Sequence, residues 1–365
     1  MTDVPSVIMR NDKRLLTMSK ENTPLTKAPT LAVFLANFNH AKYLSAALDA
    51  LLSQTRQADV IYVVDDASWD NSREIIQDYA DTYPHIVPVL NTQNRGYIAN
   101  AQEWLYERTE DYVYFAAADD FVMPDLFERT LAKLEQHPKA GLCTSLCYML
   151  DEGEMDPVFA PSPTPEMDHT GYVSPEAAAR SLYRDDSWFW GTTTIFRRKA
   201  AVECGGYDAE LYGLTDRFLS MLVSLKYGSC FIGEPLAVWR RFVSTSISAI
   251  TFKDVEISNR VLGQAITRLN DLEDGVLQKG YIRRFTKRWI YSFIERQVMQ
   301  PQPMDVGVVI DAVKPHLPGF VFGLDIVLRI PSATIRRALL AIILRPYDLK
   351  RAIVRRFESQ LFCLL

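Results

Sequence analysis

Apolar positions along the chain gather in short runs that alternate with segments of helical spacing. Runs rich in branched and aromatic residues predict buried strands, here over residues 31–35, 60–64, 86–90, 112–116 and 142–148. Apolar residues recurring every three or four positions predict helices over residues 41–54, 72–83, 97–108 and 125–136. This alternation indicates parallel βαβ units, so we expect a mainly parallel, doubly wound α/β sheet flanked by helices.

The pattern is less regular beyond residue 150. Residues 151–175 are rich in proline and acidic residues and predict a loop, which could act as a flap. Residues 230–232 and 236–239 predict two short strands, and Thr215-Asp216 opens an amphipathic helix. From residue 250 onward helical spacing dominates, so we expect a mostly helical C-terminal extension.

Polar side chains follow four of the predicted strands. They are Asn37-Phe38-Asn39, Asp65-Asp66, Asn94-Arg95 and Asp119-Asp120. In a doubly wound sheet, ligands bind at the carboxyl ends of the strands. Any one of these groups could be a solvated turn or a helix cap, but four along one edge indicate a binding site.

The Asp119/Asp120 pair is the most unusual of these groups, because two adjacent carboxylates repel each other and resist burial. Carboxylate oxygens suit Mg²⁺ or Mn²⁺, which proteins commonly share with the phosphate oxygens of a substrate. We therefore expect a metal site that holds a nucleoside diphosphate. No GxGxxG follows the first strand and no GxxxxGK[ST] occurs, which disfavours a Rossmann dinucleotide site and a P-loop.

Charge is distributed unevenly along the 365 residues. The formal net charge of −5 argues against nucleic acid as the main partner. From Ile250 onward there are 18 Lys and Arg but 11 Asp and Glu. Residues 281–298, 331–346 and 351–365 interleave basic and apolar residues, which is typical of helices that lie on an anionic membrane. Alternatively, their apolar faces pack on protein, in a helical subdomain or a homo-oligomer.

Cysteine usage and the absence of long apolar runs indicate the compartment. Five cysteines without a CxxC spacing favour free thiols in a reducing environment. The N-terminus has no apolar stretch typical of a signal peptide, and no run of about 18 uncharged apolar residues occurs. We expect a cytoplasmic protein, with the inner face of the plasma membrane as a further location.

Four blocks of the sequence carry a resemblance to a known family. They are LAVFLANFNHAKYLSAALDALLSQ, VIYVVDDASWDNS, NRGYIANAQEWL and AAADDFVMPDLFERTLAKLEQHPKAGLCTS. In this order they resemble the successive blocks of the family-2 glycosyltransferases, which are inverting, nucleotide-sugar-dependent enzymes with the GT-A fold. The resemblance covers roughly residues 30–245, and the VVDDAS and ADD blocks together make it fairly specific.

The resemblance implies a role for each polar group. Phe38 matches the aromatic position that packs on the donor base, and Asn39 beside it is a further nucleotide-sugar-binding candidate. Asp65 and Asp66 match the acidic pair that holds base and ribose. Asn94, Arg95 and Gly96 match the turn beside the nucleotide. Asp119 and Asp120 match the end of the metal-binding DxD element, with Mn²⁺ or Mg²⁺ as cofactor and Asp119 also contacting the donor. Asp216 matches the catalytic base.

Two departures from the family pattern bear on these roles. Ala117 stands where the family commonly has an acidic residue, which leaves the metal on Asp119 and Asp120 alone. Thr215 stands where the family commonly has Glu just before the catalytic Asp. A carboxylate fixed in the first turn of a helix suits a general base, although Thr215 or Asp216 could equally be a plain N-cap.

Two further pairs are candidates with open alternatives. Trp188 and Trp190, two positions apart, would face the same side of an extended segment. If they are exposed they suit stacking on an acceptor sugar, and if they are buried they belong to the core. Arg240 and Arg241 follow a predicted strand and lie where the family often has a basic residue near the diphosphate, or they form a solvated face.

Pattern and resemblance together divide the chain into three parts. We expect a flexible arm over residues 1–29, a GT-A domain over 30–249 and a basic amphipathic helical region over 250–365. Within the domain, residues 30–150 form the nucleotide-binding half and residues 151–249 the acceptor and catalytic half.

The expected function is an inverting transfer from a nucleotide-diphosphate sugar to a saccharide or lipid-linked glycan, in surface polysaccharide synthesis. One alternative is a sugar nucleotidyltransferase, although the loop after the first strand lacks the Gly-rich basic sequence which that class usually needs. The other alternative is a catalytically lapsed scaffold, as the missing acid at Ala117 would suggest.

Overall fold

The computed structural model describes residues 28–346 apart from 152–153, 155, 161–170, 186–187, 242–246 and 299–303. Most of the expected arm, the centre of the expected flap and the segment after residue 346 therefore lie outside the described residues. The strands are β1 (Leu31–Asn37), β2 (Val60–Asp65), β3 (Ile86–Leu90), β4 (Tyr112–Ala117), β5 (Phe121–Val122), β6 (Leu142–Asp151), β7 (Val158–Ala160), β8 (Gly171–Val173), β9 (Ile195–Arg197) and β10 (Ser229–Arg241).

Helices connect and extend this sheet. In the first part of the chain they are α1 (Ala41–Leu52), α2 (Ser72–Thr82), α3 (Tyr97–Glu107), α4 (Leu126–Gln136), α5 (Pro175–Asp185), η2 (Gly191–Thr193), α6 (Arg198–Glu203), η3 (Ala209–Leu214) and α7 (Thr215–Tyr227). Beyond β10 they are α8 (Ile247–Lys253), α9 (Val255–Asn270), α10 (Tyr281–Val298), α11 (Val306–Val313), η4 (Pro318–Phe320), α12 (Val321–Leu328) and α13 (Ala333–Leu344).

The described strands form one sheet in the order β3-β2-β1-β4-β9-β6-β10-β5, with β7 on β6 and β8 on β10. Strands β1 to β4 are mutually parallel, and β6 is parallel to β10, so the mainly parallel α/β class is confirmed. The strand β9 was not expected. It lies antiparallel between β4 and β6 and joins the two parallel halves of the sheet.

The two short strands expected after residue 229 are one strand in the structure. β10 runs from Ser229 to Arg241, with register shifts against β6 between Ile232 and Pro235 and between Pro235 and Val238. A bulge lets a strand absorb the Gly-Glu-Pro sequence at this point and continue on the same neighbour. The expected loop over 151–175 also contains β7 and β8.

Both faces of the central strands are buried, as a parallel sheet requires. On β1, Leu31, Val33 and Leu35 pack with residues of α1, α2 and α4. The alternate residues Ala32 and Phe34 pack with residues of α3, α6 and α7 on the other face. The central sheet therefore lies between two helical layers, and its carboxyl edge carries the predicted polar groups.

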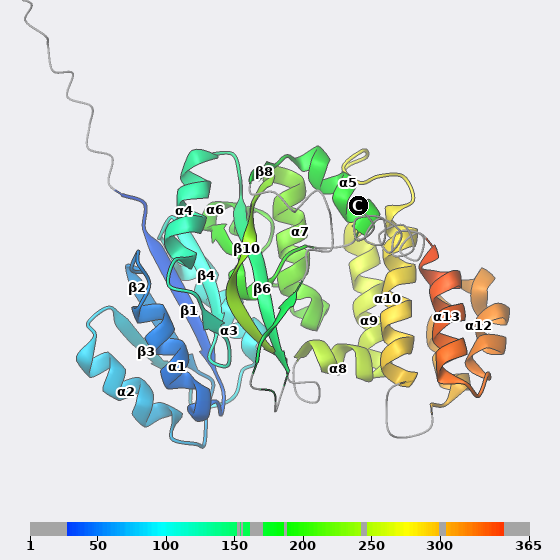
Figure 1. Cartoon of the computed structure of the whole chain (residues 1–365), viewed down its shortest axis with the longest axis horizontal. Helices are drawn as coiled ribbons and strands as arrows, with labels where there is room; N and C mark the ends of the chain where they lie inside the picture. The colour runs from blue at the N-terminus through cyan, green and yellow to red at the C-terminus, as the bar shows by residue number, and fades with distance from the viewer. Residues whose placement is uncertain are drawn as a thin grey trace, which may run out of the picture.

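The C-terminal helices continue one of these two cores. Leu262 of α9 and Trp289 of α10 belong to the same apolar cluster as Phe218 of α7. Figure 1 shows α9, α10, α12 and α13 at the end of the molecule opposite β2 and β3. The buried faces of α9 and α10 thus pack on protein. In the described part of the chain, no helix is both long and apolar enough to cross a bilayer.

The packing of α1 on the sheet generates a stability prediction. Leu48 is fully buried, so Leu48→Ala is expected to lower the free energy of unfolding by about 2–5 kcal/mol. Leu90→Ala makes the same change at a residue that is 40% exposed and should cost less than about 1 kcal/mol. Urea denaturation followed by tryptophan fluorescence measures both, and equal losses would contradict this account of the core.

Candidate active site

Asp65, at the end of β2, braces the loops that follow β1 and β2. Asn37 Nδ2 donates to Asp65 Oδ1 (2.8 Å), while Ser68 N (3.0 Å) and Arg73 Nε (3.1 Å) donate to Oδ2. Asp65 is fully buried and its charge is balanced by Arg73, a residue the sequence did not single out. The Asp65 side chain therefore holds the loops after β1 and β2 in place from a buried position.

Asp66 fixes the turn in front of α3. Its carboxylate accepts hydrogen bonds from Arg95 N (2.9 Å), Gly96 N (2.8 Å) and Asn91 Nδ2 (2.9 Å). Burial alone would raise the pKa of Asp66, but these hydrogen bonds outweigh it and hold the pKa below its usual value. Gly96 has φ +83°, a conformation that favours glycine. Asp66 is thus an ionised carboxylate that holds a tight turn.

Two aromatic rings stand at the same edge. The ring of Phe38 meets that of Trp69 edge-on, with 5.2 Å between centroids, and Asn39 Oδ1 accepts from Trp69 N (2.9 Å). Trp69 is 80% exposed, which is unusual for so large a ring and marks it as a contact surface. Trp69 was not predicted from the sequence, although a tryptophan three residues after Asp66 was a usable signal.

Asn94 and Arg95 belong to the turn that Asp66 holds. Asn94 Oδ1 accepts from Gly96 N (3.1 Å), and the Arg95 guanidinium forms an ion pair with Glu103 of α3. The Arg95 side chain thus lies along α3, and its backbone N–H donates to Asp66.

Asp120 is held between β10 and the turn η2. Arg240 N donates to Asp120 Oδ1 (3.0 Å) and Thr192 Oγ1 donates to Oδ2 (2.8 Å). Burial, reinforced by the charge of Asp119, raises the pKa of Asp120 to about 8. Burial also raises the pKa of Asp119, against the opposing charges of His40 and Arg240. At neutral pH this pair favours a proton or a cation.

Asp216 lies on the other side of the same turn. It is the second residue of α7, whose cap position is Leu214, so neither Thr215 nor Asp216 is the N-cap. A Cβ on Gly191 would lie only 2.9 Å from Asp216 Oδ2, so the turn approaches the carboxylate closely at this glycine. Burial raises the pKa of Asp216. Thus η2 places Gly191 against Asp216 and Thr192 against Asp120.

Two tyrosines that the sequence analysis missed lie beside these carboxylates. The hydroxyl oxygens of Tyr97 and Tyr207 are 3.3 Å apart, and burial raises the pKa of both phenols. The negative charge of Asp216 acts on both, and that of Asp120 acts on Tyr97. Neutral hydroxyls therefore border the carboxylates. No sequence motif distinguished these tyrosines from core residues.

Thr215 links the start of α7 to the C-terminal helices. Asp208 N donates to Thr215 Oγ1 (2.6 Å), and the Asp208 carboxylate pairs with Arg268 of α9. Arg268 also pairs with Glu210 of η3 (2.7 Å). Thus α9 supports the turn from which Asp216 projects.

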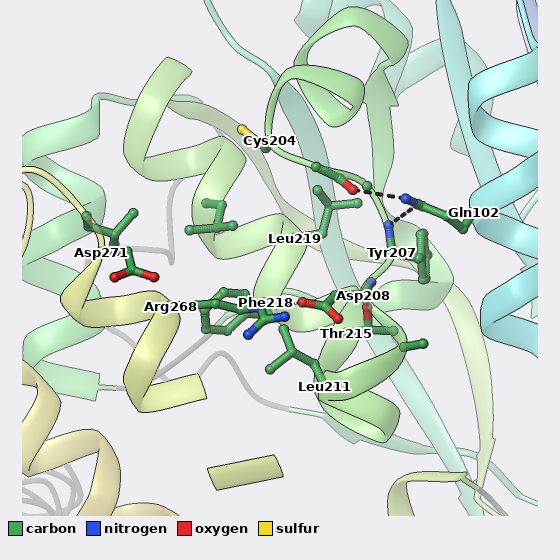
Figure 2. A pocket seen from close by; sticks show the side chains of 15 residues that line it. Gln102, Cys204, Tyr207, Asp208, Leu211, Thr215, Phe218, Leu219, Arg268 and Asp271 are labelled. Atoms are coloured by element: carbon green, nitrogen blue, oxygen red, sulfur yellow. Dashed lines mark hydrogen bonds and ion pairs between the residues drawn. The ribbon is translucent and has the colours of Figure 1, made fainter. Parts of the chain in front are cut away.

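A cavity of about 410 Å³ opens beside this link, between α3, α7 and α9. Figure 2 shows Gln102 of α3 bonded to the backbone of Gly205 and Tyr207, and Arg268 lying toward Asp208. The residues that line it do not include Asp120 or Asp216, so the cavity lies next to the carboxylates without containing them.

The structure separates the two predicted tryptophans. Trp188 is only 1% exposed and packs on Phe189 in the core that contains α3 and α7, which makes it a core residue. Trp190 packs on Trp239 at the opposite core. The expectation that both rings face one side is wrong, because this segment pairs in no strand and turns directly into η2.

The two predicted arginines also differ. The Arg240 guanidinium lies 5.0 Å from the ring centre of Tyr43, and its charge lowers the pKa of Asp119 and Asp120. Arg241 instead forms a two-point ion pair with Asp151 at the end of β6, with both distances 2.5 Å. Only Arg240 therefore belongs to the group of residues around the carboxylates.

The carboxylates at the edge fit a divalent cation only in part. Across the described residues, no group of three His, Cys, Asp or Glu side chains is placed to hold a metal ion. Asp119 and Asp120 supply hard oxygen atoms, as Mg²⁺ and Mn²⁺ prefer, and their raised pKa values show that positive charge would stabilise their ionised form. Further ligands would have to come from substrate or water.

Solved structures share this fold. S. aureus TarS in complex with UDP-GlcNAc matches with a TM-score of 0.57 at 14% identity, covering 86% of this chain and 91% of that one. A mannosyltransferase from Pyrobaculum calidifontis in complex with GDP-Man and Mn²⁺ matches with a TM-score of 0.53 at 17% identity, covering 90% and 87%. At this identity the likeness concerns the fold, which is of the GT-A type.

Sequence relatives cover a shorter stretch. The Escherichia coli K12 glycosyltransferase YibD is 30% identical over 145 residues, which are 40% of this chain and 41% of YibD. A Nostoc glycosyltransferase is 30% identical over 112 residues, or 31% of this chain and 35% of the relative. The chain thus spans well under half the length of these two relatives.

A family model extends the same assignment. The model described as "Glycosyl transferase family 2" matches residues 32–205, which contain the Asp65-Asp66 and Asp119-Asp120 pairs. With the fold and these relatives, the match confirms the resemblance read from the sequence. Residues 32–205 of the chain are thus similar to glycosyltransferase family 2.

Proposed function

We propose that this protein transfers a sugar from a nucleoside-diphosphate sugar to a hydroxyl group, with inversion at the anomeric carbon. The observation that carries the proposal is the placement of Asp120 and Asp216 on either side of η2, both with raised pKa values. One carboxylate is thereby available to a cation and the other to a proton.

The nucleoside would bind at the end of β1 and β2. Phe38 and the exposed ring of Trp69 offer apolar surface to a base, and Asn39 and the Asp66-braced turn offer polar groups to base and ribose. Asp65 supports this edge from a buried position and contributes to binding through the loops it holds. The solved neighbours bind UDP-GlcNAc and GDP-Man, which supports a nucleotide-sugar donor.

The diphosphate would lie over Asp119, Asp120 and Arg240. A Mn²⁺ or Mg²⁺ ion bound by the two aspartates would neutralise the charge that develops on the leaving diphosphate. Arg240 brings a fixed cation to the same place, while its backbone holds Asp120 in orientation. The Mn²⁺ complex of the P. calidifontis neighbour supports this cofactor.

Asp216 would act as the general base. Its raised pKa, caused by burial, brings it closer to that of a group that accepts a proton at neutral pH. The acceptor oxygen forms a bond to the anomeric carbon, the bond from that carbon to the diphosphate breaks, and the hydroxyl proton passes to Asp216. Tyr97 and Tyr207 would keep their protons and limit water around this carboxylate.

The acceptor that we propose is a saccharide or lipid-linked glycan of a surface polysaccharide, on the cytoplasmic side of the membrane. A lapsed scaffold remains the second candidate, because Ala117 removes one expected metal ligand. Donor hydrolysis with and without Mn²⁺ separates the two, since an active transferase slowly releases nucleoside diphosphate and a scaffold releases none.

A first prediction concerns donor binding. In a thermal-shift screen with Mn²⁺, one nucleoside diphosphate is expected to stabilise the chain by about 2.7 kcal/mol at about 100 times its dissociation constant. Trp69→Ala should weaken that binding by about 1–3 kcal/mol through lost stacking. If no nucleoside diphosphate shifts the transition, the proposed function is wrong.

A second prediction concerns pH and metal. Asp120 keeps its proton in the folded state up to about pH 8, whereas its unfolded pKa is 3.8, so the metal-free protein loses stability as pH rises across this window. Asp120→Asn should flatten the dependence by up to about 1.4 kcal/mol per pH unit. Mn²⁺ should stabilise the wild type more at pH 8 than at pH 6, because it binds the ionised pair.

The control for this measurement is Asp311→Asn, which removes a carboxylate from the exposed side of α11. It should keep both the pH slope and the Mn²⁺ effect. An unchanged slope in Asp120→Asn would show that Asp120 titrates normally and would remove the electrostatic basis for a cation site.

A third prediction concerns the base. Asp216→Asn is expected to keep the donor affinity of the wild type and to lower the transfer rate about 10²- to 10⁴-fold, because the acceptor hydroxyl loses its proton acceptor. Binding by calorimetry and single-turnover transfer measure the two effects separately, again with Asp311→Asn as control. Normal transfer by Asp216→Asn would assign the base elsewhere.

A further inference from the structure

A second cavity, of about 370 Å³, lies between the first turns of α10, the end of α13 and Tyr183 of α5. Five cationic side chains line it, and they are Arg283, Arg284, Lys287, Arg288 and Arg345. No acidic residue of the described chain is among its lining residues. Most of its lining residues follow residue 279, whereas the two Asp-Asp pairs at the edge of the sheet precede residue 121. The cavity is positively charged, and that edge is negatively charged.

Two of these cations fix the walls of the cavity. Arg288 Nη1 donates to the carbonyl oxygen of Leu182 (3.0 Å), and Arg284 Nη2 donates to that of Arg184 (2.6 Å). Both carbonyls belong to the last turn of α5, where cations are favoured by the helix dipole. These contacts account for the positions of the Arg284 and Arg288 side chains without any ligand.

Lys287 Nζ makes a long hydrogen bond to the carbonyl oxygen of Ile343 in α13 (3.3 Å), and Arg283 makes none among the described residues. They lie one turn apart on α10, and both pack over the ring of Phe320, at 5.9 and 4.1 Å from its centre. Neither forms an ion pair with any carboxylate in the part of the chain that is described. Like charges at this spacing destabilise a helix, and burial together with Arg283 lowers the pKa of Lys287.

The start of α10 adds to this positive potential. The helix begins at Tyr281, and the preceding Gly280 lines the cavity with φ +84° and open space where a Cβ would stand. Tyr281 N donates to the carbonyl oxygen of Gln278 (2.9 Å), so the next N–H groups are those that a helix start leaves for an anion. A helix start and two close cations at one cavity form a site for a phosphate group.

The neighbouring surface is apolar and exposed. Phe322 and Ile326 share one side of α12 and are 81% and 52% exposed, and Phe322 follows Phe320 by two residues. Figure 1 shows α12 and α13 at the far end of the molecule, away from the sheet. Arg283 and Lys287 lie over the ring of Phe320, and these exposed apolar side chains follow Phe320 closely in the chain. Cationic and apolar side chains in this order suit the boundary between lipid headgroups and acyl chains.

We propose that the cavity at Arg283 and Lys287 binds the phosphate ester of an anionic lipid, with Phe322 and Ile326 inserted beside it. This site holds the protein on a membrane surface and is separate from the donor site. The group that binds in the cavity is a phosphate. The exposed apolar side chains indicate that this phosphate belongs to a lipid.

The test is flotation of the full chain with vesicles of phosphatidylcholine and phosphatidylglycerol at about 3:1, compared with phosphatidylcholine alone. The wild type should bind only the anionic vesicles. The double variant Arg283→Gln/Lys287→Gln should bind them about 30-fold more weakly, or about fivefold per cation. Phe322→Ser should also weaken binding.

The matched control is Arg260→Gln/Lys314→Gln, which removes the same charge from exposed positions outside the cavity and should bind like the wild type. An equal loss of vesicle binding in the two double variants would overturn the site, because non-specific electrostatic attraction would then explain the binding. Failure of the wild type to bind anionic vesicles would overturn the lipid assignment.

A further measurement uses the wild type alone, in case the double variant fails to fold. Inorganic pyrophosphate, added without divalent metal, should release bound wild type from the vesicles by competing for the cavity. If pyrophosphate releases nothing, the cavity does not bind phosphate. Donor affinity should be equal in both double variants, so failure here leaves the proposed function untouched.

Discussion

The strongest physical constraint on the structure is the presence of several carboxylates partly withheld from water at one edge of a sheet. Asp119, Asp120 and Asp216 all have raised pKa values, caused first by burial. Burial of like charges is costly unless a proton, a cation or hydrogen bonds compensate it. The neighbouring backbone of β10, the hydroxyl of Thr192 and the charge of Arg240 supply only part of that compensation.

The two Asp-Asp pairs differ in how the charge of their carboxylates is compensated. At the end of β2, Asp65 and Asp66 are paired with Arg73 and with backbone N–H groups, so Asp66 is more acidic than usual. At the end of β4, Asp119 and Asp120 have fewer partners and are less acidic than usual. The first pair therefore has its partners within the protein, and the second is the pair whose ionised form a cation would stabilise most.

The sequence was sufficient to predict the βαβ half of the fold, because each strand there is a continuous apolar run and each helix a local pattern. It was also sufficient to place four polar groups at one edge, since parallel strands share their carboxyl ends. The antiparallel strand β9 could not be predicted, because its pairing with β4 and β6 depends on contacts far apart in the chain. The same holds for η2, which brings Gly191 and Thr192 between two aspartates.

The structure brings some of the predicted side chains together and separates others. Asp120, Asp216 and Arg240 lie close to one another at the candidate site, where their roles stay predictions, whereas Trp188 is a core residue and Arg241 is bound to Asp151. Tyr97 and Tyr207 resemble ordinary core aromatics in the sequence, and only the fold places their hydroxyls beside Asp216.

The link from Arg268 through Asp208 to Thr215 has a consequence for the architecture as a whole. The polar residues at the carboxyl edge of the sheet all precede residue 242. The first turn of α7 nevertheless depends on Arg268 of α9, which pairs with Asp208, the residue whose N–H donates to Thr215. A chain shortened to end at β10 would keep the polar edge of the sheet but lose the ion pair that holds Asp208, and with it one support of the turn before Asp216. The C-terminal helices therefore contribute to the local structure around Asp216 although they lie outside the sheet.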